Sequence, residues 1–96
     1  MQLGRLDHVG IAVTDLTAAR ALYERVLGLE VTHEEVITEQ GVHELLLRAG
    51  DAFVQLVAPL DPDTPVGRFL ARRGEGLHHV GYAVPDVGAA VADLRT

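Results

Sequence analysis

Residues 6–15 of this chain read LDHVGIAVTD, and residues 77–86 read LHHVGYAVPD, 71 positions later. When the comparison is extended to residues 23 and 94, ten of the eighteen aligned positions are identical. A repeat of this period indicates two copies of one supersecondary unit, each burying surface that the other cannot bury alone. Histidine holds the same place in both copies, at His8 and His79. The repeat therefore predicts two imidazoles related by approximate twofold symmetry.

The period of the repeat also sets an expected length. If the first copy extends to Gly76, a complete second copy would extend to about residue 147, whereas the sequence ends at Thr96. We therefore expect either a fragment of a longer chain or a second unit that is completed from elsewhere. The strand expected at 77–84 would then have an uncovered edge, so we expect the isolated chain to aggregate or to form a homodimer.

Composition narrows the class of protein. The 96 residues are 48% hydrophobic with a net charge of −6, which suits an ordinary globular domain and argues against nucleic-acid or anionic-membrane binding. The chain contains no cysteine, which excludes disulfides and thiolate metal sites and is compatible with a reducing compartment. We expect a cytoplasmic protein, because no signal-peptide pattern and no apolar run of about 18 residues is present.

Hydrophobic periodicity predicts a βαβββ unit, a connector and the beginning of a second unit. The expected strands are 6–13, 29–38, 43–48 and 52–58, with a helix from an N-cap at Asp15 to Gly28. In the connector, Asp63 or Thr64 would cap a short helix whose buried face carries Val66, Phe69 and Leu70. The second copy contributes a strand at 77–84 and a helix capped by Asp86.

The predicted fold class is therefore α+β, with paired βαβββ modules of which the second is truncated after its first strand and helix. We expect residues 1–96 to form one domain. Module one would cover about 6–58, the connector helix 59–76 and the partial module two 77–96.

His8 and His79 are the first candidates for metal ligands. A single histidine on a strand is commonly a packed or surface residue, but two at repeat-equivalent positions suggest convergent ligands. The small residues on the same strand faces would leave a cavity beside the imidazoles; they are Gly10, Ala12, Gly81 and Ala83. His78 is one residue out of phase with His79, so we expect it on the opposite face in a structural role.

Two further side chains are candidates for the same site. Gln55 shares a strand face with Phe53 and Val57, and is either a hydrogen-bonded core amide or an oxygen donor to the metal. Imidazole and oxygen ligands without sulfur suit Co²⁺, Mn²⁺, Ni²⁺ or Zn²⁺. Glu44 is either a solvated strand residue or a carboxylate that projects into the cavity as a general base. His33 and His43 lie among polar neighbours and are interpreted as surface residues.

Four stretches carry a family resemblance: LDHVGIAV at 6–13, QGVHE at 40–44, VQLVAPL at 54–60 and GEGLHHV at 74–80. Together they resemble the methylmalonyl-CoA epimerases of the vicinal oxygen chelate (glyoxalase/bleomycin-resistance) superfamily. The resemblance runs through essentially all 96 residues in one register. The opening motif is typical of the whole superfamily, whereas the stretch from Ala58 to His79 is more particular to the epimerases.

The resemblance implies paired βαβββ modules around one divalent metal. Carried over residue by residue, it makes His8, Gln55 and His79 metal ligands and Glu44 one of two catalytic carboxylates. The family's fourth ligand, a glutamate on the last strand of module two that is also implicated as the second base, has no counterpart before Thr96. The implied cofactor is Co²⁺, with Mn²⁺, Ni²⁺ or Zn²⁺ as alternatives, and the implied partner is an acyl-CoA thioester.

The implied reaction is epimerisation of (R)- and (S)-methylmalonyl-CoA, in which the C2 proton is removed through a metal-stabilised enolate. One alternative is a lyase like glyoxalase I, which moves a proton in a glutathione adduct. Another is a metal-free module that binds small ligands, and a third is an inactive fragment. The connector between Asp63 and His79 argues against the lyase, and the set His8, Gln55 and His79 argues against a metal-free binding module.

Overall fold

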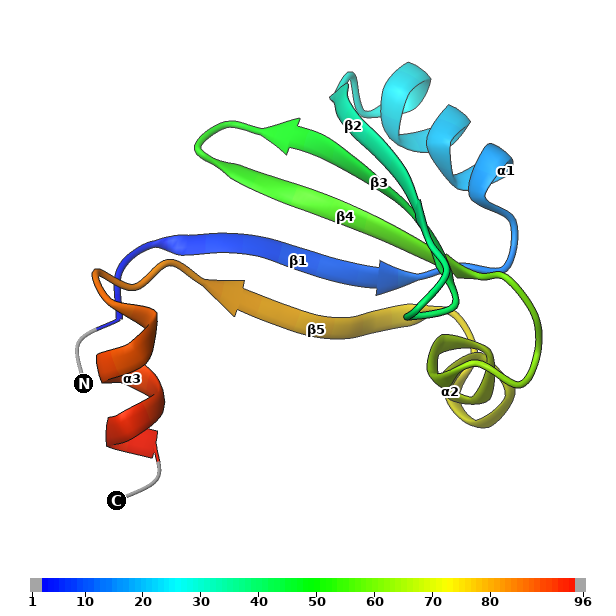
Figure 1. Ribbon diagram of the computed structural model, residues 1–96. Helices are drawn as coiled ribbons and strands as arrows, with labels where there is room; N and C mark the ends of the chain where they lie inside the picture. Colours follow the sequence, from blue (N-terminus) through cyan, green and yellow to red (C-terminus); the bar gives the residue numbers. More distant parts are fainter. Residues whose placement is uncertain (1–2, 95–96) are drawn as a thin grey trace.

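The structure is a computed structural model that describes residues 3–94 (Figure 1). One mixed sheet of five strands has the order β2-β3-β4-β1-β5. Strands β1 and β4 are parallel, and the other neighbouring pairs are antiparallel. The elements, in chain order, are β1 (Leu6–Ala12), α1 (Leu16–Ala21), η1 (Leu22–Val26), β2 (Glu30–Ile37), β3 (Val42–Ala49), β4 (Ala52–Pro59), α2 (Pro65–Arg73), β5 (Gly76–Tyr82) and α3 (Val87–Leu94).

One face of the sheet is covered by α1 and η1. The main core lies there, with Leu45, Leu47 and Leu56 as its most deeply buried large side chains. These residues alternate along β3 and β4 with residues of the other face, as the period of two in a strand requires. The expected order βαβββ, connector, β and α is confirmed, and so is the α+β fold class.

The predicted first helix is divided into two parts. Asp15 caps α1, accepting a hydrogen bond from the backbone N–H of Ala18 at 3.0 Å. The chain then widens into the π-helix η1, where the backbone N–H of Leu27 bonds to the carbonyl of Leu22 at 3.2 Å. Tyr23 in this wider turn packs against the main core, and Gly28, with φ at 71°, ends the helix.

Helix α2 covers one end of the opposite sheet face. Thr64 rather than Asp63 caps it, and its hydroxyl accepts a hydrogen bond from the N–H of Gly67 at 3.0 Å. The predicted buried residues Val66, Phe69 and Leu70 pack against a second cluster that is formed by Ala12, Val42 and Val57. The rest of this face, between α2 and the far ends of β1 and β5, carries the candidate site.

The pairing of β1 with β5 joins the two copies of the repeat (Figure 1). Val9 lies opposite Val80, His8 opposite Gly81, and Gly10 opposite His79. The register shifts once at each end of this stretch, first at Asp7 on β1 and then at His78 on β5. These positions correspond to each other in the repeat, so the two irregularities are related by the same approximate symmetry as the histidines.

Helix α3 follows β5 at the end of the sheet away from α2 (Figure 1). As predicted, Asp86 accepts a hydrogen bond at its start, from the N–H of Ala89 at 3.1 Å. Large apolar side chains on this helix are exposed, among them Val87, Val91 and Leu94. Within residues 3–94, no helix is long and apolar enough to cross a membrane.

Leu56→Ala tests the main core. Leu56 is fully buried, so the truncation removes transfer free energy and leaves a cavity, and we expect a loss of about 2–5 kcal/mol in the free energy of unfolding. Val26→Ala is the matched control, because Val26 is 72% exposed, and it should change stability by less than about 0.5 kcal/mol. Urea unfolding measures both values. Equal effects would show that the β4 core does not determine stability.

Candidate functional site

His8 and His79 meet on the sheet face that α1 does not cover. Their Nε2 atoms are 3.2 Å apart, and their rings meet edge to face with centroids 5.2 Å apart. Both imidazoles are half-buried. The two repeat-related histidines therefore direct the same ring nitrogen toward one point.

Two glycines make this approach possible. A Cβ added to Gly10 would overlap the ring of His79, and a Cβ added to Gly81 would overlap the ring of His8. Each histidine thus lies over the glycine of the other copy. The small residues were expected to leave a cavity beside the imidazoles. The structure instead shows the rings filling the space over Gly10 and Gly81.

Gln55 lies in the same row across the sheet, because Gly10 pairs with Gln55 on one side and with His79 on the other. Its amide Nε2 donates a hydrogen bond to Glu44 Oε2 at 2.5 Å. Its Oε1 is buried and has no hydrogen-bond partner. A buried carbonyl oxygen without a partner is unfavourable by itself, so this atom is suited to a bound ligand.

Glu44 projects from β3 onto the same face and is only 9% exposed. Its carboxylate contacts Gln55, and its negative charge acts on the imidazole of His79. The four predicted site residues therefore form two contacting pairs on one face of the sheet, His8 with His79 and Glu44 with Gln55. One pair lies on β3 and β4 and the other on the neighbouring strands β1 and β5.

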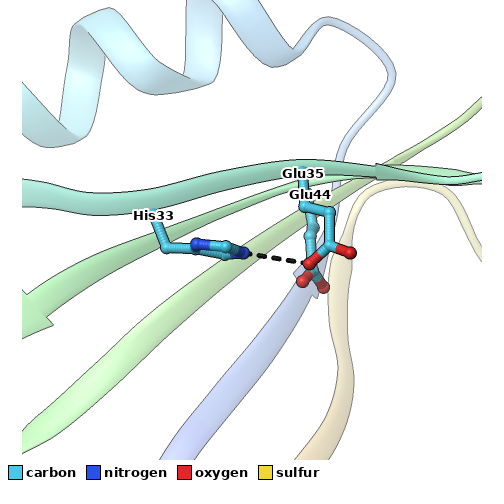
Figure 2. Close-up of side chains that lie close together, drawn as sticks. All are labelled: His33, Glu35 and Glu44. Carbon is cyan, nitrogen blue, oxygen red and sulfur yellow. Dashed lines mark hydrogen bonds and ion pairs between the residues drawn. The ribbon is translucent and has the colours of Figure 1, made fainter.

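Two residues that the sequence did not suggest also approach Glu44. Figure 2 shows His33 and Glu35 of β2 beside Glu44 of β3, with the side chains pointing toward one another. Ligand atoms of the three lie within 4.8 Å of one another, and His33 Nε2 is 3.0 Å from Glu35 Oε1. His33 is exposed, as predicted, but it lies on the site face. The three residues form a second group that could hold a cation.

A bulge explains why alternation along β2 could not place His33. Val31 pairs with Leu47 and packs in the main core, but His33 pairs with Leu46 on the other face. Thr32 is the extra residue between them, so two residues at a spacing of two lie on opposite faces. The feature that could have indicated this group is the antiparallel register of β2 and β3, which places Glu35 opposite Glu44.

His43 and His78 differ in their relation to the site. His43 pairs with Glu34, with 2.7 Å between Nε2 and Oε2, and it alternates with Glu44 onto the opposite face. His78 was expected on the opposite face as well, but its Nδ1 lies 2.9 Å from Nδ1 of His79. The register shift at His78 allows this contact. His78 also packs edge to face on Phe69, with ring centroids 4.8 Å apart.

Electrostatics keep His79 available as a ligand. Burial lowers the pKa of the His79 imidazole below its ordinary value, and the neighbouring His78 and His8 lower this pKa further. Glu44 acts in the opposite direction without reversing the shift. Neutral imidazole is the form that binds metals, so the shift favours ligation at neutral pH.

The donor set fits a divalent ion. Two nitrogens 3.2 Å apart can both lie about 2.1 Å from one ion, the usual length of a zinc–imidazole bond. The unpartnered Oε1 of Gln55 would add an oxygen ligand, and such nitrogen and oxygen sets suit borderline divalent metals. The cluster of His33, Glu35 and Glu44 has a similar donor chemistry but is more exposed at His33 and Glu35.

The chain is similar to proteins of a known family. The family model described as the Glyoxalase/Bleomycin resistance protein/Dioxygenase superfamily matches residues 7–96. Methylmalonyl-CoA epimerase of Bos taurus is 42% identical over 94 residues, which cover 97% of this chain and 54% of the bovine protein. The chain spans about half the length of the curated relatives that it matches.

Solved structures agree with this similarity. A variant of Streptomyces coelicolor methylmalonyl-CoA epimerase in complex with 2-nitronate-propionyl-CoA is 42% identical, with a TM-score of 0.92. The match covers 98% of this chain and 71% of that one. A methylmalonyl-CoA epimerase in complex with methylmalonyl-CoA and NH4+ is 43% identical, again with a TM-score of 0.92, over 98% of this chain and 69% of that one. This chain therefore belongs to the Glyoxalase/Bleomycin resistance protein/Dioxygenase superfamily.

Proposed function

We propose that this protein epimerises methylmalonyl-CoA by removing and returning the proton at C2. The observation that carries the proposal is the convergence of His8 Nε2 and His79 Nε2 to 3.2 Å, on the sheet face that also carries Gln55 and Glu44. Relatives named methylmalonyl-CoA epimerase, including one bound to methylmalonyl-CoA, support the choice of substrate. The alternative of a glutathione-dependent lyase finds no comparable support among these relatives.

The proposed cofactor is a divalent ion, Co²⁺ in the first place, held by His8, Gln55 and His79. When held by these residues, the ion would supply Lewis-acid chemistry that stabilises the negative charge developing as C2 of the thioester loses its proton. Gln55 is oriented for this role because its Nε2 donates to Glu44 and leaves Oε1 free.

Glu44 is the proposed base. Its carboxylate is shielded from water, and the Gln55 amide holds Oε2 in one orientation. An oriented carboxylate beside the substrate can take the C2 proton without first reorganising a shell of water molecules. Glu44 would then carry the proton on one face of C2.

Substitutions can show which group of side chains binds the metal. The two candidates are the proposed ligands His8, Gln55 and His79 and the group formed by His33, Glu35 and Glu44. We expect the chain to bind one Co²⁺, and we expect His79→Ala and Gln55→Ala to weaken binding at least about tenfold, since each removes a ligand. Gly81→Ala should also weaken binding, because its methyl group displaces the His8 ring. Isothermal titration calorimetry measures these affinities.

His33→Ala and His43→Ala are the matched histidine controls in this titration, and both should retain the affinity of the unaltered chain. Loss of binding in His33→Ala with full binding in His79→Ala would instead place the ion between His33, Glu35 and Glu44.

Deuterium uptake at C2 tests the reaction. In D2O with Co²⁺, we expect this chain to exchange the C2 proton of methylmalonyl-CoA, and Glu44→Gln to lose this activity by about 100-fold or more, since a general base contributes about 10²–10⁴. Gln can still accept the hydrogen bond from Gln55, so the site geometry should be preserved. His43→Gln is the control on the opposite face. Full exchange in Glu44→Gln would contradict the assigned base.

We also propose a homodimer in the cytoplasm. The absence of cysteine suits a reducing compartment. Exposed apolar side chains on β5 and α3, including Leu77, Val80 and Tyr82, support self-association.

Sedimentation velocity tests the oligomeric state. We expect a species of twice the chain mass that Val80→Lys shifts toward the monomer, because the charge would be buried in the interface. Val26→Lys, on the exposed η1, should have no effect. A clean monomer with a cooperative unfolding transition would contradict the dimer.

A further inference from the structure

Asp7 and His78 occupy equivalent positions in the two copies of the repeat, each directly before a proposed ligand histidine. Each also lies at a register shift of the β1–β5 pair. The pairing passes from Leu6–Tyr82 to His8–Gly81 without Asp7, and from Gly10–His79 to Ile11–Leu77 without His78. Such bulges redirect side chains and are common beside active sites.

The redirected side chains complete a chain of hydrogen bonds. Asp7 Oδ2 lies 2.9 Å from His8 Nδ1, and His78 Nδ1 lies 2.9 Å from His79 Nδ1. The contact of 3.2 Å between the two Nε2 atoms joins these pairs in the order Asp7, His8, His79, His78. Asp7 is further contacted by Arg5, whose Nη2 lies 3.9 Å from Oδ1.

The number of protons on the three imidazoles fixes which group donates in each of these hydrogen bonds. A carboxylate can only accept, so the proton of His8 must be on Nδ1. Neutral imidazole carries a single N–H, so Nε2 of His8 accepts and Nε2 of His79 donates. Nδ1 of His79 then accepts a hydrogen bond that Nδ1 of His78 donates. With every imidazole neutral, this is the arrangement that satisfies all three contacts.

An ion bound between the two Nε2 atoms requires different protonation of His79 and His78. His8 already offers an unprotonated Nε2, whereas His79 must move its proton from Nε2 to Nδ1. His78 must then accept, so its proton moves from Nδ1 to Nε2. Both shifts exchange protons with water, and the net release from these residues is zero.

We propose that Asp7 and His78 are positioning residues of two different kinds for the proposed metal centre. Asp7 holds His8 permanently in the ligand tautomer. His78 can donate or accept, and it lets His79 change tautomer when the ion binds. The inference rests on the proposed function for the ion itself, but the tautomers of the metal-free chain can be measured independently.

Nitrogen-15 NMR of the histidine rings tests the proposal at pH 8, above the ordinary imidazole pKa of about 6.5. In the metal-free chain we expect protons on Nδ1 of His8, Nε2 of His79 and Nδ1 of His78. With Zn²⁺, His8 should be unchanged, while the protons of His79 and His78 move to Nδ1 and Nε2. A proton on Nε2 of His8, or an Nδ1 proton on His79 before zinc is added, would overturn the proposal.

Substitutions separate the two roles. Asp7→Leu should release His8 from its single tautomer, and His78→Leu should leave the metal-free tautomer of His79 unchanged. Both should lower the affinity for Zn²⁺ by about 10–100-fold, as is typical of residues that orient metal ligands. His78→Gln should restore most of the affinity, because an amide can donate or accept without changing tautomer. Equal loss in His78→Leu and His78→Gln would contradict the switching role.

Glu34→Gln is the matched control, since Glu34 is a carboxylate paired with a histidine of the same sheet, His43, outside the site. It should leave the tautomers of His8, His79 and His78 and the zinc affinity unchanged. A folded chain with the expected metal-free tautomers that fails to bind Zn²⁺ would contradict the metal centre and the switch of His79, while it would support the role of Asp7.

Discussion

The site depends on the contact between His8 and His79, in which the ring of His8 lies over Gly81 and the ring of His79 lies over Gly10. Neither ring could reach the other if Gly10 or Gly81 carried a side chain, because a Cβ at either position would occupy the space of the imidazole. The same pairing joins β1 to β5 and so holds the two copies of the repeat together. The pairing of β1 with β5 therefore also brings the two proposed ligands together.

Gln55 lies on β4, between the strand of His8 and the strand of Glu44. An amide group has a donor end and an acceptor end, and Glu44 engages the donor. The acceptor is left buried on the face where the histidines converge. A single hydrogen bond thus orients the proposed base and the proposed oxygen ligand together, and neither can rotate without disturbing the other.

The sequence carried enough information for the order of elements, the cap at Asp15 and the shared face of His8, Gln55 and His79, because these follow from period-two alternation and from the repeat. It correctly indicated that His33 is exposed but not that it lies on the site face, and it placed His78 on the wrong face. In both cases a bulge changes the face of a residue, at Thr32 on β2 and at His78 itself on β5. A bulge depends on the partner strand, so alternation along one strand cannot reveal it.

Approximate symmetry alone would place the same groups beside both histidines. The repeat keeps histidine, valine and glycine identical and differs directly before the histidine, where Asp7 corresponds to His78. An aspartate beside one imidazole accepts only, whereas a histidine beside the other can reverse its hydrogen bond. The difference at this position therefore makes two nearly identical strands chemically unequal at the point where they meet.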